Sequence, residues 1–413
     1  MNYLTRFVFN QLKKHLEQPE MSLILGPRQA GKTTLLHRLE EELAQKKVPT
    51  TYLNLDVIED FQYFRTQHTL LKEIQQRIGE KGVVFLDEIH RLTNSGLFLK
   101  GLYDLKTPYK FIATGSGALE LKANIIEPMT GRKKIFYCLP LSFTEFVANQ
   151  MAIASEDVSA RLDANPYAKN RFLSQYLTYG GYPRVILAQT HHEKIDILSE
   201  LYTSYLEKDI QLILKVEKEQ SFSMLVKILA SQVGSIINRA ELASTLGVTE
   251  KTIEKYLLLL EKTFVVSLVR PFFRNSRKEL RKSPKVYFYD LGLLHFSQGI
   301  RPHINYPVSG PVFENACYLR LLELRLVEPI RFWRSVSGAE VDFILTSSTD
   351  GTPLPIEVKL SPRKNTLGKS LFNFLKKYAP HTAYFYTKEA TYKTEKFGIP
   401  IISVPYHRLL PVA

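Results

Sequence analysis

A glycine-rich stretch that ends in Gly31, Lys32 and Thr33 constrains this sequence more than any other feature. Residues 26–33 read GPRQAGKT, fit the pattern G-x-x-x-x-G-K-[ST], and stand between the apolar run MSLIL and a helix-like segment. Glycines at such a turn let backbone N–H groups close around phosphate oxygens, and the following helix adds positive potential. The pattern predicts a nucleotide-binding loop formed by Gly26, Pro27, Arg28, Gln29, Ala30, Gly31, Lys32, Thr33 and Thr34.

A second apolar run, VVFL, ends in the acids Asp87 and Glu88. A buried strand that ends in carboxylates can deliver them to the phosphate site, so we expect ATP and Mg²⁺ as cofactors. Thr33 and Asp87 would hold the metal, Lys32 would reach the β- and γ-phosphates, and Glu88 would polarise the attacking water. Lys32, Asp87 and Glu88 are thus predicted catalytic residues. The segment 114–116, TGS, ends the next apolar run and offers Ser116 to help place that water.

The segment 21–140 alternates short apolar runs with helix-like sequence. The runs MSLIL, TYLNL, VVFLDE and KFIATGS read as buried strands. This order predicts an α/β fold with a parallel sheet and helices on both of its faces.

The middle of the chain favours a winged helix-turn-helix. Residues 222–230 have apolar side chains at helical spacing. Asn238 can cap a short helix that Gly247 ends, and Thr249 can cap the next helix. Two strand-like runs follow, FVVSLV and KVYFYD. Two short helices, a tight turn and a hairpin predict this motif.

The final part begins with helix-like sequence at about residue 310 and continues with the strand-like runs RFWRS, AEVDFIL and LPIEVKL. It predicts a separate small α/β domain. We therefore expect three units: an ATPase module with a helical extension at 1–215, the winged helix-turn-helix at 216–300, and the small α/β domain at 301–413.

Several segments resemble AAA-type ATPases that carry a C-terminal domain of unknown function. They are GPRQAGKTT, FLDEIH, TGS, MTGR, LPLSFTEF, YGGYP, VDFIL and IEVK. The resemblance implies a homo-oligomer, with a hexameric ring as the candidate assembly. It also implies an arginine that reaches the γ-phosphate of the neighbouring subunit, for which Arg132 is the matching residue. That Arg132 only anchors a loop stays open, and Arg184 can either sense nucleotide or belong to a structural turn.

The charge of the chain favours a polyanionic partner, since 55 Lys and Arg against 41 Asp and Glu give a formal net charge of +14. Lys251, Thr252 and Lys255 are candidates on a recognition helix. Seven basic residues lie between Arg270 and Lys285, against one acid, Glu279. As a wing, this stretch could follow a phosphate backbone, although a solvated hairpin or a protein-docking arm is the alternative. Its candidates for DNA binding are Arg270, Arg274, Arg277, Lys278, Arg281 and Lys282.

The C-terminal part holds an acid, another acid and an E-x-K pair: Glu314, Asp342, Glu357 and Lys359. Strand alternation puts Glu357 and Lys359 on one face, and pairing of the strands would bring Asp342 close. The pattern resembles the restriction-endonuclease-like fold, in which two carboxylates hold Mg²⁺ and a lysine activates water. A DNA-binding or degenerate domain is the alternative.

Together these features predict Mg²⁺-dependent ATP hydrolysis by an oligomeric ATPase that binds DNA and remodels or translocates it. Branched DNA is an attractive substrate that the sequence does not identify. Two alternatives remain: a nucleotide-controlled protein-interaction switch and an ATP-dependent DNA nuclease. The first residues lack the pattern of a signal peptide, no apolar run reaches the ~20 residues of a membrane span, and only two cysteines occur, so we expect a cytoplasmic protein.

Overall fold

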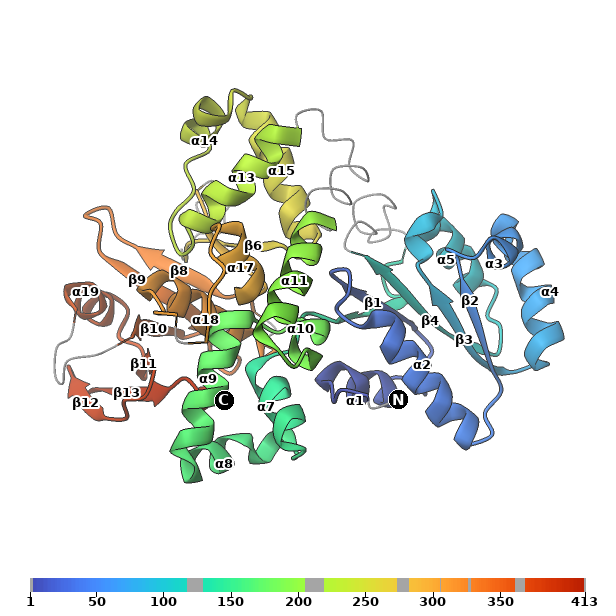
Figure 1. The fold of residues 1–413 in the computed structure, drawn as a ribbon, viewed down its shortest axis with the longest axis horizontal. Coiled ribbons are helices and arrows are strands. Elements are labelled where there is room, and N and C mark those ends of the chain that lie inside the picture. Colours follow the sequence, from blue (N-terminus) through green and yellow to red (C-terminus); the bar gives the residue numbers. More distant parts are fainter. Residues whose placement is uncertain are drawn as a thin grey trace.

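The computed structural model describes residues 3–116, 129–204, 219–272, 282–304, 306–325, 328–360 and 368–411. An α/β layer stands at one end, helices occupy the middle, and a second sheet lies at the other end (Figure 1). The predicted fold class is confirmed to this level: a five-stranded parallel sheet, a helical region and a C-terminal mixed sheet.

The first sheet has the strand order β2-β3-β4-β1-β5, and all its neighbours are parallel. Four of its strands are those expected from the apolar runs. The fifth, β5, was not predicted, because its sequence KKIFY is short and basic. The strands are β1 (Met21–Gly26), β2 (Thr50–Asn54), β3 (Gly82–Asp87), β4 (Tyr109–Ser116) and β5 (Lys133–Tyr137).

Helices cover both faces of this sheet because its strands are apolar on both sides. Ile24 and Phe85 face a core shared with α1 (Phe7–Lys14) and α2 (Lys32–Gln45). The neighbouring residues Leu25 and Leu86 face the opposite core. That core includes residues of α4 (Gln67–Ile78) and α5 (Ser95–Asp104), and the short α3 (Ile58–Phe61) precedes α4. The parallel strands therefore all end at one edge, where the nucleotide loop begins.

A helical region follows the first sheet. Its helices are α7 (Phe143–Met151), α8 (Val158–Ala164), α9 (Pro166–Tyr179), α10 (Pro183–Leu187) and α11 (His191–Leu201). The turn between α9 and α10 packs so closely that a Cβ on Gly181 would lie 2.1 Å from the carbonyl oxygen of Leu141. The backbone N–H of Gly181 donates to Asp290 at 2.6 Å. The GGYP segment is therefore a structural turn.

Three helices and a two-stranded antiparallel sheet come next, in the order expected. They are α13 (Glu219–Ser231), α14 (Arg239–Leu246), α15 (Glu250–Lys262), β6 (Val266–Val269) and β7 (Lys285–Phe288). The predicted caps are confirmed: the side chains of Asn238 and Thr249 accept backbone N–H groups at the starts of α14 and α15. Gly247 ends α14 at φ +62°, a conformation that favours glycine.

The C-terminal sheet has six strands in the order β12-β13-β11-β10-β9-β8, and it is preceded by α17 and α18. Its strands β8, β9 and β10 match the three predicted runs. The elements are α17 (Leu291–Ser297), α18 (Gly310–Leu322), β8 (Arg331–Arg334), β9 (Glu340–Thr346), β10 (Pro353–Lys359), α19 (Lys369–Tyr378), β11 (Ala383–Thr387), β12 (Lys393–Lys396) and β13 (Ile399–Pro405).

One hydrophobic core extends from Leu141 to Leu410 and joins the helical region to the C-terminal sheet. Arg320 of α18 is fully buried and reinforces this junction. It donates to the backbone oxygens of Tyr406 and His407, at 3.1 and 3.0 Å, and to the hydroxyl of Thr144 in α7. The segments after residue 141 therefore pack as one block, and the three-unit boundaries remain a prediction.

Candidate functional site

The glycine-rich loop connects the end of β1 to the start of α2, as its pattern requires. Gly31 precedes α2 at φ +96°, which a residue with a side chain adopts only with strain. The ammonium group of Lys32 is buried and donates to the carbonyl oxygens of Gly26 and Pro27, at 3.1 and 2.8 Å. Burial lowers the pKa of Lys32, which Glu88 and Asp87 oppose. The lysine is thus held at the loop that is expected to cradle phosphates.

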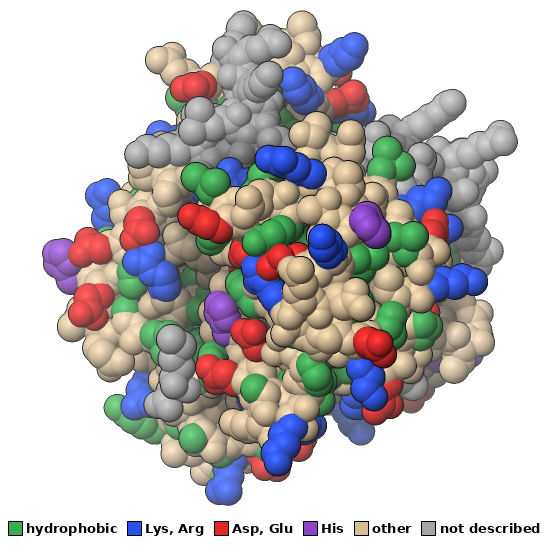
Figure 2. All heavy atoms as spheres, turned by 90° about the vertical axis from the view of Figure 1, so that its right-hand side faces the viewer, with side chains coloured by type: hydrophobic (Ala, Val, Ile, Leu, Met, Phe, Trp, Pro, Cys, Tyr) green, Lys and Arg blue, Asp and Glu red, His purple; other side chains and the backbone are tan. Residues whose placement is uncertain are grey.

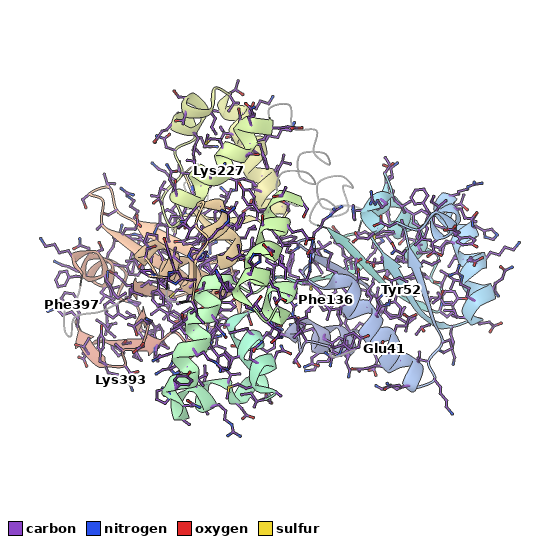
Figure 3. All side chains as sticks on the ribbon, viewed as in Figure 1. Glu41, Tyr52, Phe136, Lys227, Lys393 and Phe397 are labelled. Carbon is purple, nitrogen blue, oxygen red and sulfur yellow. The ribbon has the colours of Figure 1, made fainter. Side chains whose placement is uncertain are left out.

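Asp87 ends β3 and is the centre of a hydrogen-bond network around its buried carboxylate. One oxygen accepts from the hydroxyl of Thr33 at 2.8 Å and from that of Tyr52 at 2.5 Å. The other accepts from the hydroxyl of Thr114 in β4. Tyr52, labelled in Figure 3, comes from the neighbouring strand β2. The structure brings the two proposed metal-binding residues into direct contact and adds Tyr52, which sequence reasoning missed.

Glu88 follows Asp87 in the left-handed conformation, at φ +56°. Its carboxylate lies 2.9 Å from Nδ1 of the buried His90. Burial would raise the pKa of Glu88, but His90, Lys32 and Arg28 outweigh it and lower that pKa. Glu88 is therefore held as a carboxylate beside the loop. The sequence could have indicated His90, because this histidine follows Glu88 by two residues in the segment FLDEIH.

A cavity of about 790 Å³ opens beside the loop, between the first sheet and the helical region. Residues 28–29 and 31–34 line one side, together with Glu88 and, from the start of the chain, Tyr3 and Leu4. Pro183, Arg184, Leu187 and Glu200 of α10 and α11 line the other side. Arg184 pairs with Glu200 at 2.7 Å and donates to Gln29 of the loop at 3.0 Å. Arg184 thus faces the predicted nucleotide site, although GGYP itself is a structural turn.

Arg6 also lines the cavity and holds the loop in place. It is buried, and its guanidinium donates to the carbonyl oxygen of Ala30 at 2.9 Å and to that of Leu139. Its Nε also pairs with Glu145 of α7 at 3.4 Å. Sequence reasoning missed Arg6 because an isolated arginine near a chain end carries no pattern. Of the remaining predicted site residues, Ser116 pairs through its backbone with Gly26, and its side chain is outside the described part.

Arg132 lies at the opposite end of the sheet from the loop. Its carbonyl oxygen accepts from the N–H of Met21, the first residue of β1, whereas the loop begins at the last residue, Gly26. Five residue steps of a strand span roughly 17 Å. The guanidinium pairs instead with Asp104 at 2.7 Å. Arg132 therefore does not contact the phosphate loop of its own chain.

The described candidates for DNA contact lie mostly on the surface. Lys251, Lys255, Arg270 and Lys282 are exposed, and Thr252 is half-buried against the cap residue Thr249. The exposed face of α15 also carries the acids Glu250 and Glu254. The prediction that Lys285 belongs to an exposed basic wing is wrong, because its side chain is buried and faces away from solvent. Arg274, Arg277, Lys278 and Arg281 lie outside the described residues.

The C-terminal acids do come together. The carboxylate of Asp342 accepts the N–H of Val358 at 2.7 Å, and Glu357 pairs with Lys359 at 2.8 Å. Burial, together with the charges of Glu314 and Glu357, raises the pKa of Asp342 well above its ordinary value. The carboxylate of Glu314, however, accepts from Lys285 and from the hydroxyl of Tyr287. Among the described residues, no group of three or more His, Cys, Asp or Glu side chains is arranged to hold a metal ion.

The loop, the buried lysine and the threonine–aspartate contact lie at the ends of parallel strands, an arrangement typical of P-loop nucleotide-binding proteins. Comparison with models of protein families identifies three domains in the chain. Residues 18–147 match the model of an AAA domain, residues 170–303 that of the domain of unknown function DUF8612, and residues 309–407 that of the domain of unknown function DUF4143. The chain therefore carries an AAA-type ATPase domain, which implies ATP binding, followed by these two domains.

Relatives match most of the chain in sequence. An uncharacterized protein of Mycobacterium tuberculosis is 27% identical over 357 residues, which is 84% of this chain and 72% of that protein. An uncharacterized protein of Haemophilus influenzae is 26% identical over 357 residues, which is 83% of this chain and 82% of its own length.

Solved structures show weaker likeness. The Aeropyrum pernix ORC1 protein in complex with DNA has 13% identity and a TM-score of 0.31, covering 71% of this chain and 91% of its own. AMPPCP-bound DnaA from Aquifex aeolicus has 12% identity and a TM-score of 0.27, covering 63% and 90%. In the described part of the chain, no helix has both the length and the apolar composition that crossing a membrane requires.

Proposed function

We propose that the protein hydrolyses ATP with Mg²⁺ in the cavity beside the glycine-rich loop and uses the reaction to act on DNA. The observation that carries the proposal is the hydrogen bond between the hydroxyl of Thr33 and the carboxylate of Asp87, next to the buried ammonium of Lys32. Hydroxyl and carboxylate oxygens are ligands that Mg²⁺ prefers. These residues therefore fit the Mg²⁺ ion that accompanies a nucleoside triphosphate. The cavity beside the loop has a volume suited to a ligand of nucleotide size.

The chain's own residues then have defined tasks. Backbone N–H groups of residues 26–33 bind phosphate oxygens, and Lys32 exchanges the carbonyls of Gly26 and Pro27 for the β- and γ-phosphates. The bound Mg²⁺ would supply charge neutralisation between these phosphates. Glu88 accepts a proton from the water that attacks the γ-phosphorus, while the bond from that phosphorus to the ADP oxygen breaks. Glu88 already lines the cavity, and its 2.9 Å contact with His90 would orient the carboxylate for this step.

Arg132 is proposed to act on the neighbouring subunit of a homo-oligomeric ring. The distance of this residue from its own loop supports a role in trans. Its exposed pair with Asp104 can be exchanged for a γ-phosphate at a subunit boundary, where charge neutralisation by an arginine raises the rate ~10³–10⁵-fold. A hexamer remains the candidate assembly.

For DNA, we propose that α13–α15 with β6–β7 form a winged helix-turn-helix and that the C-terminal sheet has a nuclease-like fold, with the domain boundaries given above. The order of the elements, the caps of α14 and α15 and the exposed Lys251 and Lys255 support the first part. Figure 2 shows the face at the AAA-domain end, where positive and negative side chains are interspersed. The net charge of +14 is therefore not concentrated on that face.

The test is steady-state ATPase activity with linear, single-stranded and branched DNA. Wild-type protein should hydrolyse ATP faster with DNA, and Glu88→Gln should bind ATP normally but hydrolyse it ~10²–10⁴-fold more slowly. Glu80→Gln is the matched control, because Glu80 is exposed near the other end of β3 and should leave turnover unchanged. Normal turnover by Glu88→Gln would remove that residue from the mechanism.

One observation favours a second function, a nucleotide-controlled protein-interaction switch. The exposed surfaces of α13 and α15 carry the apolar residues Met224 and Leu258, at 50% and 46% exposure. The exposed face of α15 also carries Glu250 and Glu254 next to Lys251 and Lys255. Exposed apolar side chains among charges of both signs suit a protein partner better than a phosphate backbone. If no DNA binds in low salt or changes the ATPase rate, this function replaces the DNA-directed one while the ATP site stands.

A further inference from the structure

Lys285 begins β7, and its ammonium group lies among the carboxylates of the C-terminal domain. Its side chain is 1% exposed. The ammonium nitrogen lies 2.6 Å from a carboxylate oxygen of Glu340 in β9 and 3.1 Å from one of Glu314 in α18. The same nitrogen lies 5.5 Å from the centre of the Phe332 ring. Because burying an unpaired ammonium costs several kcal/mol, this lysine depends on the acids around it.

The charge of Lys285 is retained in this environment. Burial opposes the charged form, yet Glu314, Asp342 and Glu340 raise the pKa of Lys285 above its ordinary value. A full positive charge therefore stands beside Glu314 and acts electrostatically on Asp342, which are two of the four residues that the sequence assigned to a metal-dependent nuclease.

Other contacts fix β7 against α18. The hydroxyl of Tyr287 donates to the same oxygen of Glu314 at 2.6 Å. The side chain of Asn315 accepts the N–H of Phe288 at 2.6 Å and donates to its carbonyl oxygen at 2.9 Å. Lys285, Tyr287 and Phe288 thus all bond to residues of α18, and the position of Lys285 is set by the fold.

One carboxylate oxygen of each acid is committed to a partner. Glu314 binds Lys285 and Tyr287, Asp342 binds the N–H of Val358, and Glu357 binds Lys359. Only the second oxygen of Glu357 is buried without a hydrogen-bond partner among the acids of this cluster in the described structure. Mg²⁺ demands near-octahedral oxygen ligands at 2.0–2.1 Å, so a cluster whose centre is shared with a fixed ammonium does not fit it.

We propose that Lys285 is the resident cation of the cluster Glu314, Glu340 and Asp342, and that it excludes a divalent metal from this place. The cluster then serves to fix the β6–β7 sheet to the C-terminal sheet. As a consequence, the C-terminal domain is not a metal-dependent nuclease in this conformation, and the orientation of the proposed wing is tied to the C-terminal domain.

The experiment is Mn²⁺ titration of the full chain at pH 7.5 without nucleotide, followed by the EPR signal of free Mn²⁺. Wild type and Asp342→Asn should bind the same number of ions. Lys285→Met should bind one more, and the double variant Lys285→Met/Asp342→Asn should return to the wild-type number. Lys285→Arg is the matched control, because it keeps a cation and should gain no ion.

Two outcomes would overturn the proposal. In one, Asp342→Asn binds fewer ions than wild type, which would show a metal already present at the cluster. In the other, a folded Lys285→Met gains no ion, which would show that the lysine is not what excludes the metal. If Lys285→Met is not folded, as judged by the loss of cooperative unfolding, the comparison of wild type with Asp342→Asn still decides whether a metal ion is bound at the cluster. All variants leave the ATP site intact, so unchanged ATP binding separates this result from a failure of the proposed function.

Discussion

Replacing Tyr52 by phenylalanine tests whether Asp87 works through the network that surrounds it. The change removes one hydroxyl and keeps the ring, which stacks on His37 with centroids 4.6 Å apart. The lost bond runs to the carboxylate oxygen of Asp87 that also accepts from Thr33. Tyr52→Phe should therefore disturb the orientation of the proposed metal-binding acid without a cavity in the core.

The size of the effect follows from the kind of bond. A hydrogen bond to a charged group contributes about 1.5–3 kcal/mol. We expect the lower end, because Asp87 keeps the hydroxyls of Thr33 and Thr114 and because Tyr52 is half-buried. Since about 1.4 kcal/mol corresponds to a factor of ten, kcat/KM for ATP should fall about tenfold, and more Mg²⁺ should be needed for half-maximal rate.

Tyr109→Phe is the matched control. Tyr109 belongs to the same sheet and its hydroxyl also makes a 2.5 Å hydrogen bond, but the acceptor is the backbone oxygen of Gly79, away from the loop. The assay is steady-state hydrolysis over a range of Mg²⁺ concentrations. Equal kinetics for the two variants, or an unchanged Mg²⁺ requirement in Tyr52→Phe, would refute the role of this network.

Three further predictions concern other parts of the chain. Arg132→Ala should bind ATP but lose ~10³-fold in rate, and mixing it with Lys32→Ala should restore part of the activity, because Arg132 of the Lys32→Ala subunit completes the intact loop of the Arg132→Ala subunit; no restoration would contradict action in trans. Burial raises the pKa of Asp290 to about 6 despite its bonds to backbone N–H groups, whereas the unfolded carboxyl has an ordinary pKa of about 3.9, so between pH 6 and 4 the folded state holds a proton that the unfolded state lacks. The stability advantage of wild type over Asp290→Asn should therefore grow by up to about 3 kcal/mol as pH falls through this range, and a constant gap in thermal unfolding would contradict it. Lys251→Ala/Lys255→Ala should weaken DNA binding and reduce the slope of log affinity against log salt by about two, whereas an unchanged slope would place the phosphate contacts elsewhere.

The sequence predicts the first sheet and the nucleotide loop well because their signals are local. Glycines, the lysine and the apolar runs act through residues that are neighbours in the chain, and the parallel arrangement of the strands follows from their alternation with helices. The edge strand Lys133–Tyr137 escapes this reasoning, since only one of its five side chains is buried. Edge strands need little apolar surface, so periodicity does not reveal them.

Contacts between distant elements account for what the sequence leaves out. Tyr52 reaches Asp87 because β2 pairs with β3 in a register that only the folded sheet defines. Lys285 reads as one more basic residue of a wing, yet its strand directs it inward, where it meets Glu314 and Glu340. A charge pattern records how many lysines a segment has, and burial decides which of them face solvent.

The most direct test of the account is binding of Mg–ATP to purified, folded protein, measured by calorimetry for wild type and for Lys32→Ala. We predict that wild type binds one nucleotide per chain and that Lys32→Ala loses most of this affinity while unfolding cooperatively. Folded wild-type protein without affinity for Mg–ATP, or Lys32→Ala with undiminished affinity, would contradict the assignment of the loop at residues 26–33.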